Sequence, residues 1–109
     1  MSDNLESKNN LTLPDFQKYV AKVLKERGFD DETIPEKFML LMEECGEFAK
    51  AARKTQSIKS DKKSENFYLT DEAADVFMYL LDICNQFGID LEKAFREKEA
   101  KNKKRNWEY

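Results

Sequence analysis

Two pairs of carboxylates are the part of the sequence best suited to chemistry. Glu44 and Glu47 form the first pair, and Glu72 and Asp75 form the second. Residues three apart on a helix share one face and lie about 4.5 Å apart along the axis. On a helical wheel, Glu44 falls inside an apolar arc and Glu47 lies at its edge, and Glu72 and Asp75 repeat this relation. Solvated carboxylates belong on the opposite face, so these positions require an explanation.

Antiparallel packing of the two helices would bring all four carboxylates together, where they repel one another and lose hydration. Protonation or a bound cation must then compensate for the charge. A cluster of oxygen ligands suits Mg²⁺ or Mn²⁺, and an incompletely filled coordination shell leaves room for phosphate oxygens. The pattern therefore indicates metal-assisted chemistry on a phosphate ester or anhydride. The wheels leave one alternative open, in which both pairs are boundary residues that pair with lysines of another helix.

The residue types restrict the chemistry further. The 109 residues include no His, which excludes Ser-His and Cys-His catalysis, HExxH zinc sites and Glu-x-x-His di-iron sites. A net charge of -3 makes a nucleic acid polymer an unexpected partner. No apolar run is long enough to span a membrane, so we expect no membrane association and a cytoplasmic location. Cys45 and Cys84 lack CxxC spacing, and we expect both to be reduced.

The elements that must position the carboxylates are helices, because the chain contains only three Gly and two Pro and shows long stretches of 3.6-residue periodicity. We expect an all-α fold, a four-helix-type bundle in a single domain that oligomerisation completes. The predicted helices cover residues 13–27, 34–54, 70–87 and 90–105. Their ends are marked by the capping residues Thr12, Thr33 and Asp90 and by the stop signals Gly28 and Gly88.

The remaining segments are predicted to be irregular. Residues 1–10 are expected to be disordered, which leaves 11–109 as the folded domain, and the polar stretch 55–66 is expected to be a mobile loop. Phenylalanines on the apolar stripes are expected to form the core. They are Phe38, Phe48, Phe77, Phe87 and Phe95.

The motif EECGE at 43–47, followed by EAAD at 72–75, resembles the EExxE…ExxD signature of the MazG-like, all-α nucleoside triphosphate pyrophosphohydrolases. The resemblance continues through the flanking residues and covers roughly 36–107. It implies Mg²⁺-dependent cleavage of a nucleoside triphosphate into the monophosphate and pyrophosphate, by a homodimer or homotetramer that removes non-standard or surplus nucleotides. Mn²⁺ is a possible substitute for Mg²⁺.

The resemblance also implies roles for individual residues. The metal ligands would be Glu44, Glu47, Glu72 and Asp75. Glu47 or Glu44 would accept the proton of the attacking water, with Glu43 in support. Lys98, Asn102 and Arg105 would contact the substrate, and Lys54 is a weaker candidate for the same role.

Two other functions remain open at the level of the sequence. Phosphoribosyl-ATP pyrophosphohydrolases have a similar fold and similar carboxylates, although the EECGE motif fits the MazG-like group better. A non-catalytic helical interaction module is the second alternative. A module of this kind would not require four carboxylates inside or beside the apolar arcs of its helices.

Overall fold

The computed structural model describes residues 5, 8–57 and 62–105, and these residues form four α-helices and no strand. The helices are α1 (Leu13–Glu26), α2 (Ile34–Ser57), α3 (Lys62–Gln86) and α4 (Leu91–Lys103). The all-α class is therefore confirmed. None of the helices has both the length and the apolar character that crossing a membrane requires.

Local chemistry sets most of the helix ends close to where the sequence predicts them; the facing ends of α2 and α3 are the exceptions. The N-termini of α1 and α2 carry capping boxes, and in the second the Thr33 N–H donates to Glu36 Oε1 at 2.7 Å. Asp90 caps α4 by accepting from the Lys93 N–H at 3.1 Å. Beyond α1 and α3, Gly28 and Gly88 have φ angles of 83° and 66°. Glycine adopts this left-handed conformation without strain, so the chain can turn there.

The predicted mobile loop over residues 55–66 is wrong for most of its length. α2 continues to Ser57 and α3 begins at Lys62, so that only residues 58–61 separate them. These four residues, and most of the predicted disordered N-terminus, lie outside the described residues. Residues 55–66 contain no Gly or Pro and include three Lys, a residue that favours helix. Extending a helix already anchored by packing costs much less than nucleating a new one.

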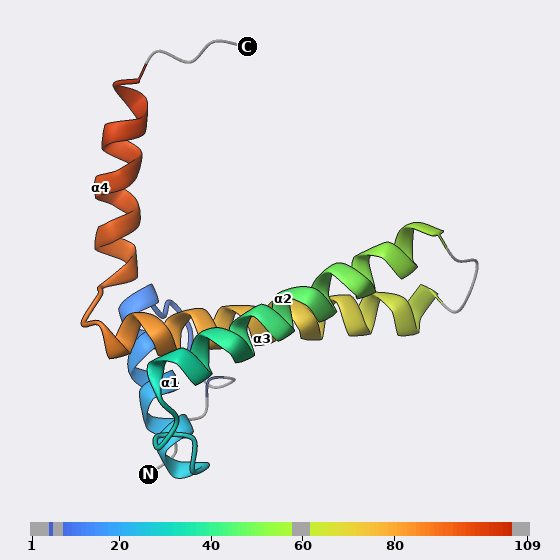
Figure 1. Cartoon of the computed structure of the whole chain (residues 1–109). Helices are drawn as coiled ribbons and strands as arrows, with labels where there is room; N and C mark the ends of the chain where they lie inside the picture. The colour runs from blue at the N-terminus through green and yellow to red at the C-terminus, as the bar shows by residue number, and fades with distance from the viewer. Residues whose placement is uncertain (1–4, 6–7, 58–61, 106–109) are drawn as a thin grey trace.

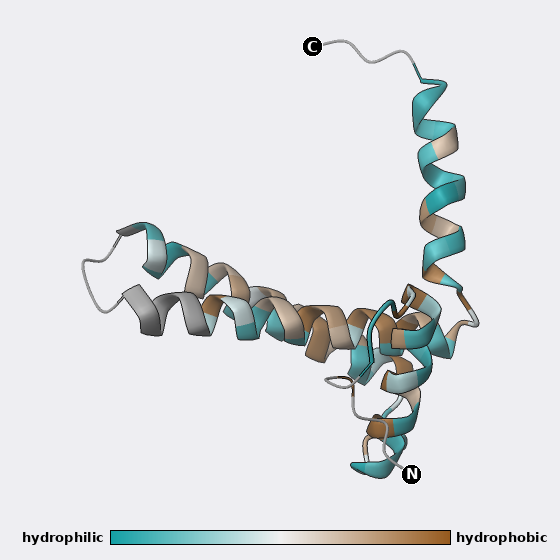
Figure 2. Cartoon of the chain, turned by 180° about the vertical axis from the view of Figure 1, so that it is seen from behind, coloured by the Kyte–Doolittle hydropathy of each residue, from teal (hydrophilic) through white to brown (hydrophobic). Residues whose placement is uncertain are grey.

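The hydrophobic core lies where α1 crosses the C-terminal half of α3. Val20 and Leu24 of α1 pack against Leu81 of α3, which is fully buried. Partly buried apolar residues surround this centre: Leu13, Phe16, Met78 and Leu91. Figure 2 shows that hydrophobic residues gather at this crossing, whereas α4 is largely hydrophilic.

A polar contact joins three of the helices beside this core. The Gln17 amide of α1 donates to Asn85 Oδ1 at 3.0 Å and to the Ile89 carbonyl at 2.8 Å, and it accepts from the Leu91 N–H at 3.0 Å. These bonds tie α1 to the end of α3 and to the first residue of α4.

The core does not include the five phenylalanines predicted for it. All five are exposed in the single chain, and Phe95 is 66% exposed. The reason is the arrangement of the helices: α2 and α3 form a long antiparallel hairpin, and α4 projects away from it (Figure 1). The apolar stripes are present as predicted, but within one chain their phenylalanines are covered only in part. Phe77 contacts Phe16 of α1, and Phe38 contacts Phe87, with ring centroids 6.1 and 6.5 Å apart.

Candidate functional site

The predicted carboxylate cluster forms midway along the α2–α3 hairpin. Glu44 of α2 and Glu72 and Asp75 of α3 each present an oxygen atom, and the three oxygens lie within 4.8 Å of one another. Glu44 and Glu72 are half-buried, whereas Glu47 and Asp75 are exposed. This difference in exposure agrees with the helical wheels, which place Glu44 and Glu72 inside the apolar arcs and Glu47 and Asp75 at the edges.

Burial and mutual repulsion oppose ionisation of the two half-buried carboxyl groups. The pKa of Glu44 is raised above its ordinary value, first by burial and then by the negative charges of Asp75, Glu47 and Glu72. The pKa of Glu72 is raised by burial and by Glu47 and Asp75. Atom Oε2 of each residue is buried without a hydrogen-bond partner. Unsatisfied buried acceptors are rare in folded proteins, and here a cation would satisfy both.

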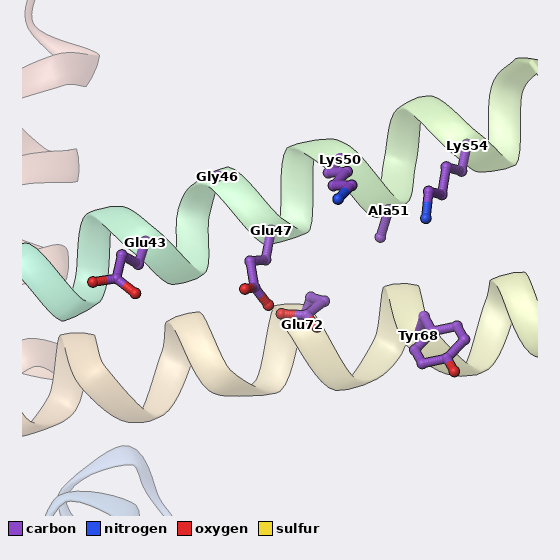
Figure 3. A pocket seen from close by; sticks show the side chains of 8 residues that line it. All are labelled: Glu43, Gly46, Glu47, Lys50, Ala51, Lys54, Tyr68 and Glu72. Atoms are coloured by element: carbon purple, nitrogen blue, oxygen red, sulfur yellow. The ribbon is translucent and has the colours of Figure 1, made fainter.

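A pocket of about 480 Å³ opens beside this cluster, toward the tip of the hairpin. In Figure 3, Glu47 and Lys54 extend from α2 toward α3, from which Glu72 and Tyr68 extend. The full lining is Glu43, Gly46, Glu47, Lys50, Ala51, Lys54, Tyr68 and Glu72. Carboxylates at one end and lysines at the other form a site with the charge pattern for a cation and an anionic ligand together.

Lys54, for which a substrate role is expected, lines this pocket. Lys50 was missed, because the wheel places both it and Glu43 on the solvent side of α2. The pocket lies along the flank of the apolar arc, between its edge and the solvent face. Continuing the row from Glu47 by three and seven residues gives Lys50 and Lys54, and this row is the signal that would have found both.

The other expected substrate residues lie elsewhere in the single chain. Lys98, Asn102 and Arg105 belong to α4 or its C-terminal end, and α4 packs mainly against α1. None of the three lines the pocket. Within one chain, the structure does not bring them to the carboxylates (Figure 1).

A buried lysine between α2 and α3 was also missed. Lys37 is only 1% exposed, and its Nζ lies 2.6 Å from Asp82 Oδ2, 3.2 Å from the Phe29 carbonyl oxygen and 3.6 Å from Glu32 Oε1. The sequence alone does not reveal this burial, since a single lysine in an amphipathic helix is expected to be exposed to solvent.

One lysine, Lys37, does form an ion pair across this hairpin, as the alternative interpretation supposed, but its partner there is Asp82 and not one of the four carboxylates. In the part of the chain that the structure describes, Glu44, Glu47, Glu72 and Asp75 form no ion pair. Among the residues that the structure describes, no Lys or Arg pairs with any of the four carboxylates.

Two comparisons with known proteins bear on this arrangement, one with curated proteins and one with family models. No curated protein matches the chain with significant similarity. The family model of the MazG nucleotide pyrophosphohydrolase domain matches residues 33–108, a range that contains α2, α3 and α4 and therefore the whole cluster and pocket. The chain thus belongs to the MazG nucleotide pyrophosphohydrolase domain family.

Proposed function

We propose that the protein hydrolyses nucleoside triphosphates to the monophosphate and pyrophosphate, and that it depends on Mg²⁺. The observation that carries the proposal is the group of three carboxylates from two helices, each with an oxygen within 4.8 Å of the others. Glu44 and Glu72 of this group each have one buried oxygen, Oε2, without a hydrogen-bond partner. Family membership supports the reaction class.

The donor set fits a hard divalent cation. Glu44, Glu72 and Asp75 would hold it, and Glu47 stands beside them with its charge acting on both glutamates. All the donors are oxygens, which Mg²⁺ and Mn²⁺ prefer. When bound, the ion would neutralise charge on the triphosphate and on the pyrophosphate leaving group.

The residues of the pocket suit the remaining tasks. Lys50 and Lys54 lie where they can hold the phosphates beyond the cluster. Water attacks the α-phosphorus, the bond from that phosphorus to the bridging oxygen breaks, and a carboxylate accepts the water's proton. Glu47 suits this role because it lines the pocket and lies outside the group of three, and Glu43 supports it from the same helix.

We further propose that the chain assembles as a homodimer or homotetramer. Its accessible surface is 8788 Å², whereas a compact monomer of 12.9 kDa exposes about 6300 Å². Its radius of gyration is 16.8 Å against about 13 Å expected for its length. Exposed Met39, Met42 and Phe95 provide apolar surface for a second copy. In such an assembly, Lys98, Asn102 and Arg105 of one subunit could face the pocket of another.

The test is pyrophosphate release by the purified protein with Mg²⁺ and a panel of canonical and modified nucleoside triphosphates, with phosphoribosyl-ATP included. Glu44→Gln removes one ligand charge at nearly constant volume, and we expect turnover to fall by at least about 100-fold. Glu99→Gln on exposed α4 is the matched control and should retain full activity. Preference for modified nucleotides would support a housecleaning role. Failure to release pyrophosphate from any nucleoside triphosphate, with the fold intact, would refute the proposal, and release from phosphoribosyl-ATP alone would assign the other activity.

A further inference from the structure

Lys37 and Asp82 form the buried charged contact between the two helices that carry the carboxylates. Burying a lysine is unfavourable unless the charge is paired and hydrogen-bonded. Lys37 meets this condition through Asp82 and the Phe29 carbonyl, with Glu32 nearby. Buried ion pairs contribute little net stability compared with apolar residues, and their best-attested use is to fix the register of packed helices.

The spacing of the ion pair from the cluster is the same on both helices. Lys37 lies seven residues before Glu44 on α2, and Asp82 lies seven residues after Asp75 on α3. Seven residues make two helical turns, about 10.5 Å. Because the helices run antiparallel, the register that places Lys37 opposite Asp82 also places Glu44 opposite Asp75.

The cluster tolerates little movement of this register. Its three oxygens lie within 4.8 Å of one another. A slip of α2 along α3 by a single turn would move Glu44 by about 5.4 Å, more than the width of the cluster. An apolar interface would resist such a slip weakly, because many apolar contacts can re-form after it. Separation of Lys37 from Asp82 would leave the buried Asp82 carboxylate without its paired charge and remove the shortest contact of Lys37.

One half-buried side chain of α3 lies between the ion pair and the cluster. Tyr79 lies between Asp75 and Asp82 on α3 and is half-buried. Its pKa is raised by burial, then by the charges of Glu32 and Glu44, followed by those of Asp75 and Asp82. One side chain is therefore within electrostatic reach of both groups.

We propose that Lys37 and Asp82 are positioning residues, which hold α2 and α3 in the register that assembles the carboxylates for cation binding. The inference rests on the cation site proposed above. It extends the site to two residues that touch neither cation nor nucleotide.

The experiment measures Mn²⁺ binding to the metal-free full-length protein, without nucleotide, by electron paramagnetic resonance of the free ion. The main variant is the double substitution Lys37→Met and Asp82→Leu, which removes both charges and leaves an apolar pair that folds well in other proteins. The matched control is Gln17→Leu, which removes the buried polar contact among α1, α3 and α4 and leaves the α2–α3 contact intact. Circular dichroism establishes that each variant is folded.

We expect the double variant to lose about 10- to 100-fold in Mn²⁺ affinity, the usual effect of removing the support of metal ligands, and Gln17→Leu to bind as the wild type does. A purely structural role would lower the melting temperature and leave the affinity of the folded protein unchanged. Wild-type affinity in the folded double variant overturns the inference, and so does an equal loss in Gln17→Leu.

If the double variant does not fold, Asp82→Asn provides the comparison. It keeps the size of the side chain but removes the charge that pairs with Lys37, so the register is held less firmly and binding should weaken. Wild-type affinity in that variant also overturns the inference. A wild-type protein that binds no Mn²⁺ refutes the proposed cation site itself, so the two failures are distinguishable.

Discussion

Removing the charge of Glu44 should stabilise the metal-free protein while it destroys the site. Two unit charges 4.8 Å apart, the largest separation in the cluster, repel by about 1 kcal/mol in a water-like environment. Glu44 faces two other cluster carboxylates, so Glu44→Gln should raise the free energy of unfolding by about 1–2 kcal/mol at pH 8. For a domain of this size each kcal/mol raises the melting temperature by about 4–8 °C.

Mg²⁺ should reverse the order of the two melting temperatures, so that the wild type melts above Glu44→Gln. A cation at 100 times its dissociation constant stabilises the folded wild type by about 2.7 kcal/mol. Glu44→Gln loses much of that gain because it lacks one ligand. The variant is therefore expected to melt above the wild type in EDTA and below it in excess Mg²⁺.

The stability difference between Glu44→Gln and the wild type should depend on pH, in a direction that follows from the pKa of Glu44. Burial and the neighbouring carboxylates raise the pKa of Glu44 above its ordinary value of 4.5. A raised carboxyl pKa means that the ionised group destabilises the fold above that pKa and imposes no such penalty below 4.5, where it is protonated in both states. The advantage of Glu44→Gln in EDTA should thus shrink as the pH falls and disappear below about 4.5.

Thermal unfolding followed by circular dichroism, at one protein concentration, tests all three expectations. Glu99→Gln, which makes the same change on exposed α4, should melt as the wild type does under every condition. The reasoning is refuted if Glu44→Gln melts below the wild type in EDTA at pH 8, or if Mg²⁺ stabilises both proteins equally.

Two further predictions concern the pocket and the assembly. Lys54→Ala should raise KM for the nucleotide about 10-fold with a smaller change in kcat, because it removes a phosphate contact made in both ground and transition states. Steady-state kinetics measure both constants, and a fall in kcat alone would contradict this expectation. Light scattering should give the wild type a mass of at least twice its 12.9 kDa chain mass. Met39→Glu should lower that mass, because the Met39 side chain is 67% exposed in the single chain. A monomeric wild type would contradict the proposed assembly.

The sequence predicted the features that depend on neighbouring residues. Most helix ends follow from capping side chains and glycines within a turn of the boundary, and Thr33 with Glu36 forms the expected capping box. The half-buried positions of Glu44 and Glu72 follow from helical periodicity alone. Both kinds of feature are visible in a window of one or two turns.

Features that depend on packing between helices could not be read in this way. The Lys37–Asp82 contact joins residues 45 apart in the chain, and neither residue differs in type from a solvated one. The phenylalanines were placed correctly on stripes, but which helix covers a stripe is decided by the angle at which α4 leaves α3. The loop was overestimated because polar residues with high helix propensity can extend a helix that is anchored elsewhere.

The order of groups along α3 has a consequence for how the protein opens. The core contacts involve Met78 and Leu81, the cluster lies at Glu72 and Asp75, and the pocket reaches outward to Tyr68. The same helix thus passes from a firmly packed base to a segment that lies beside its partner α2 (Figure 1). Local unfolding should cost little free energy at the tip and approach the global value at the base. A ligand in the pocket would bind the half that opens most readily, so binding and ordering of the hairpin would be a single linked equilibrium.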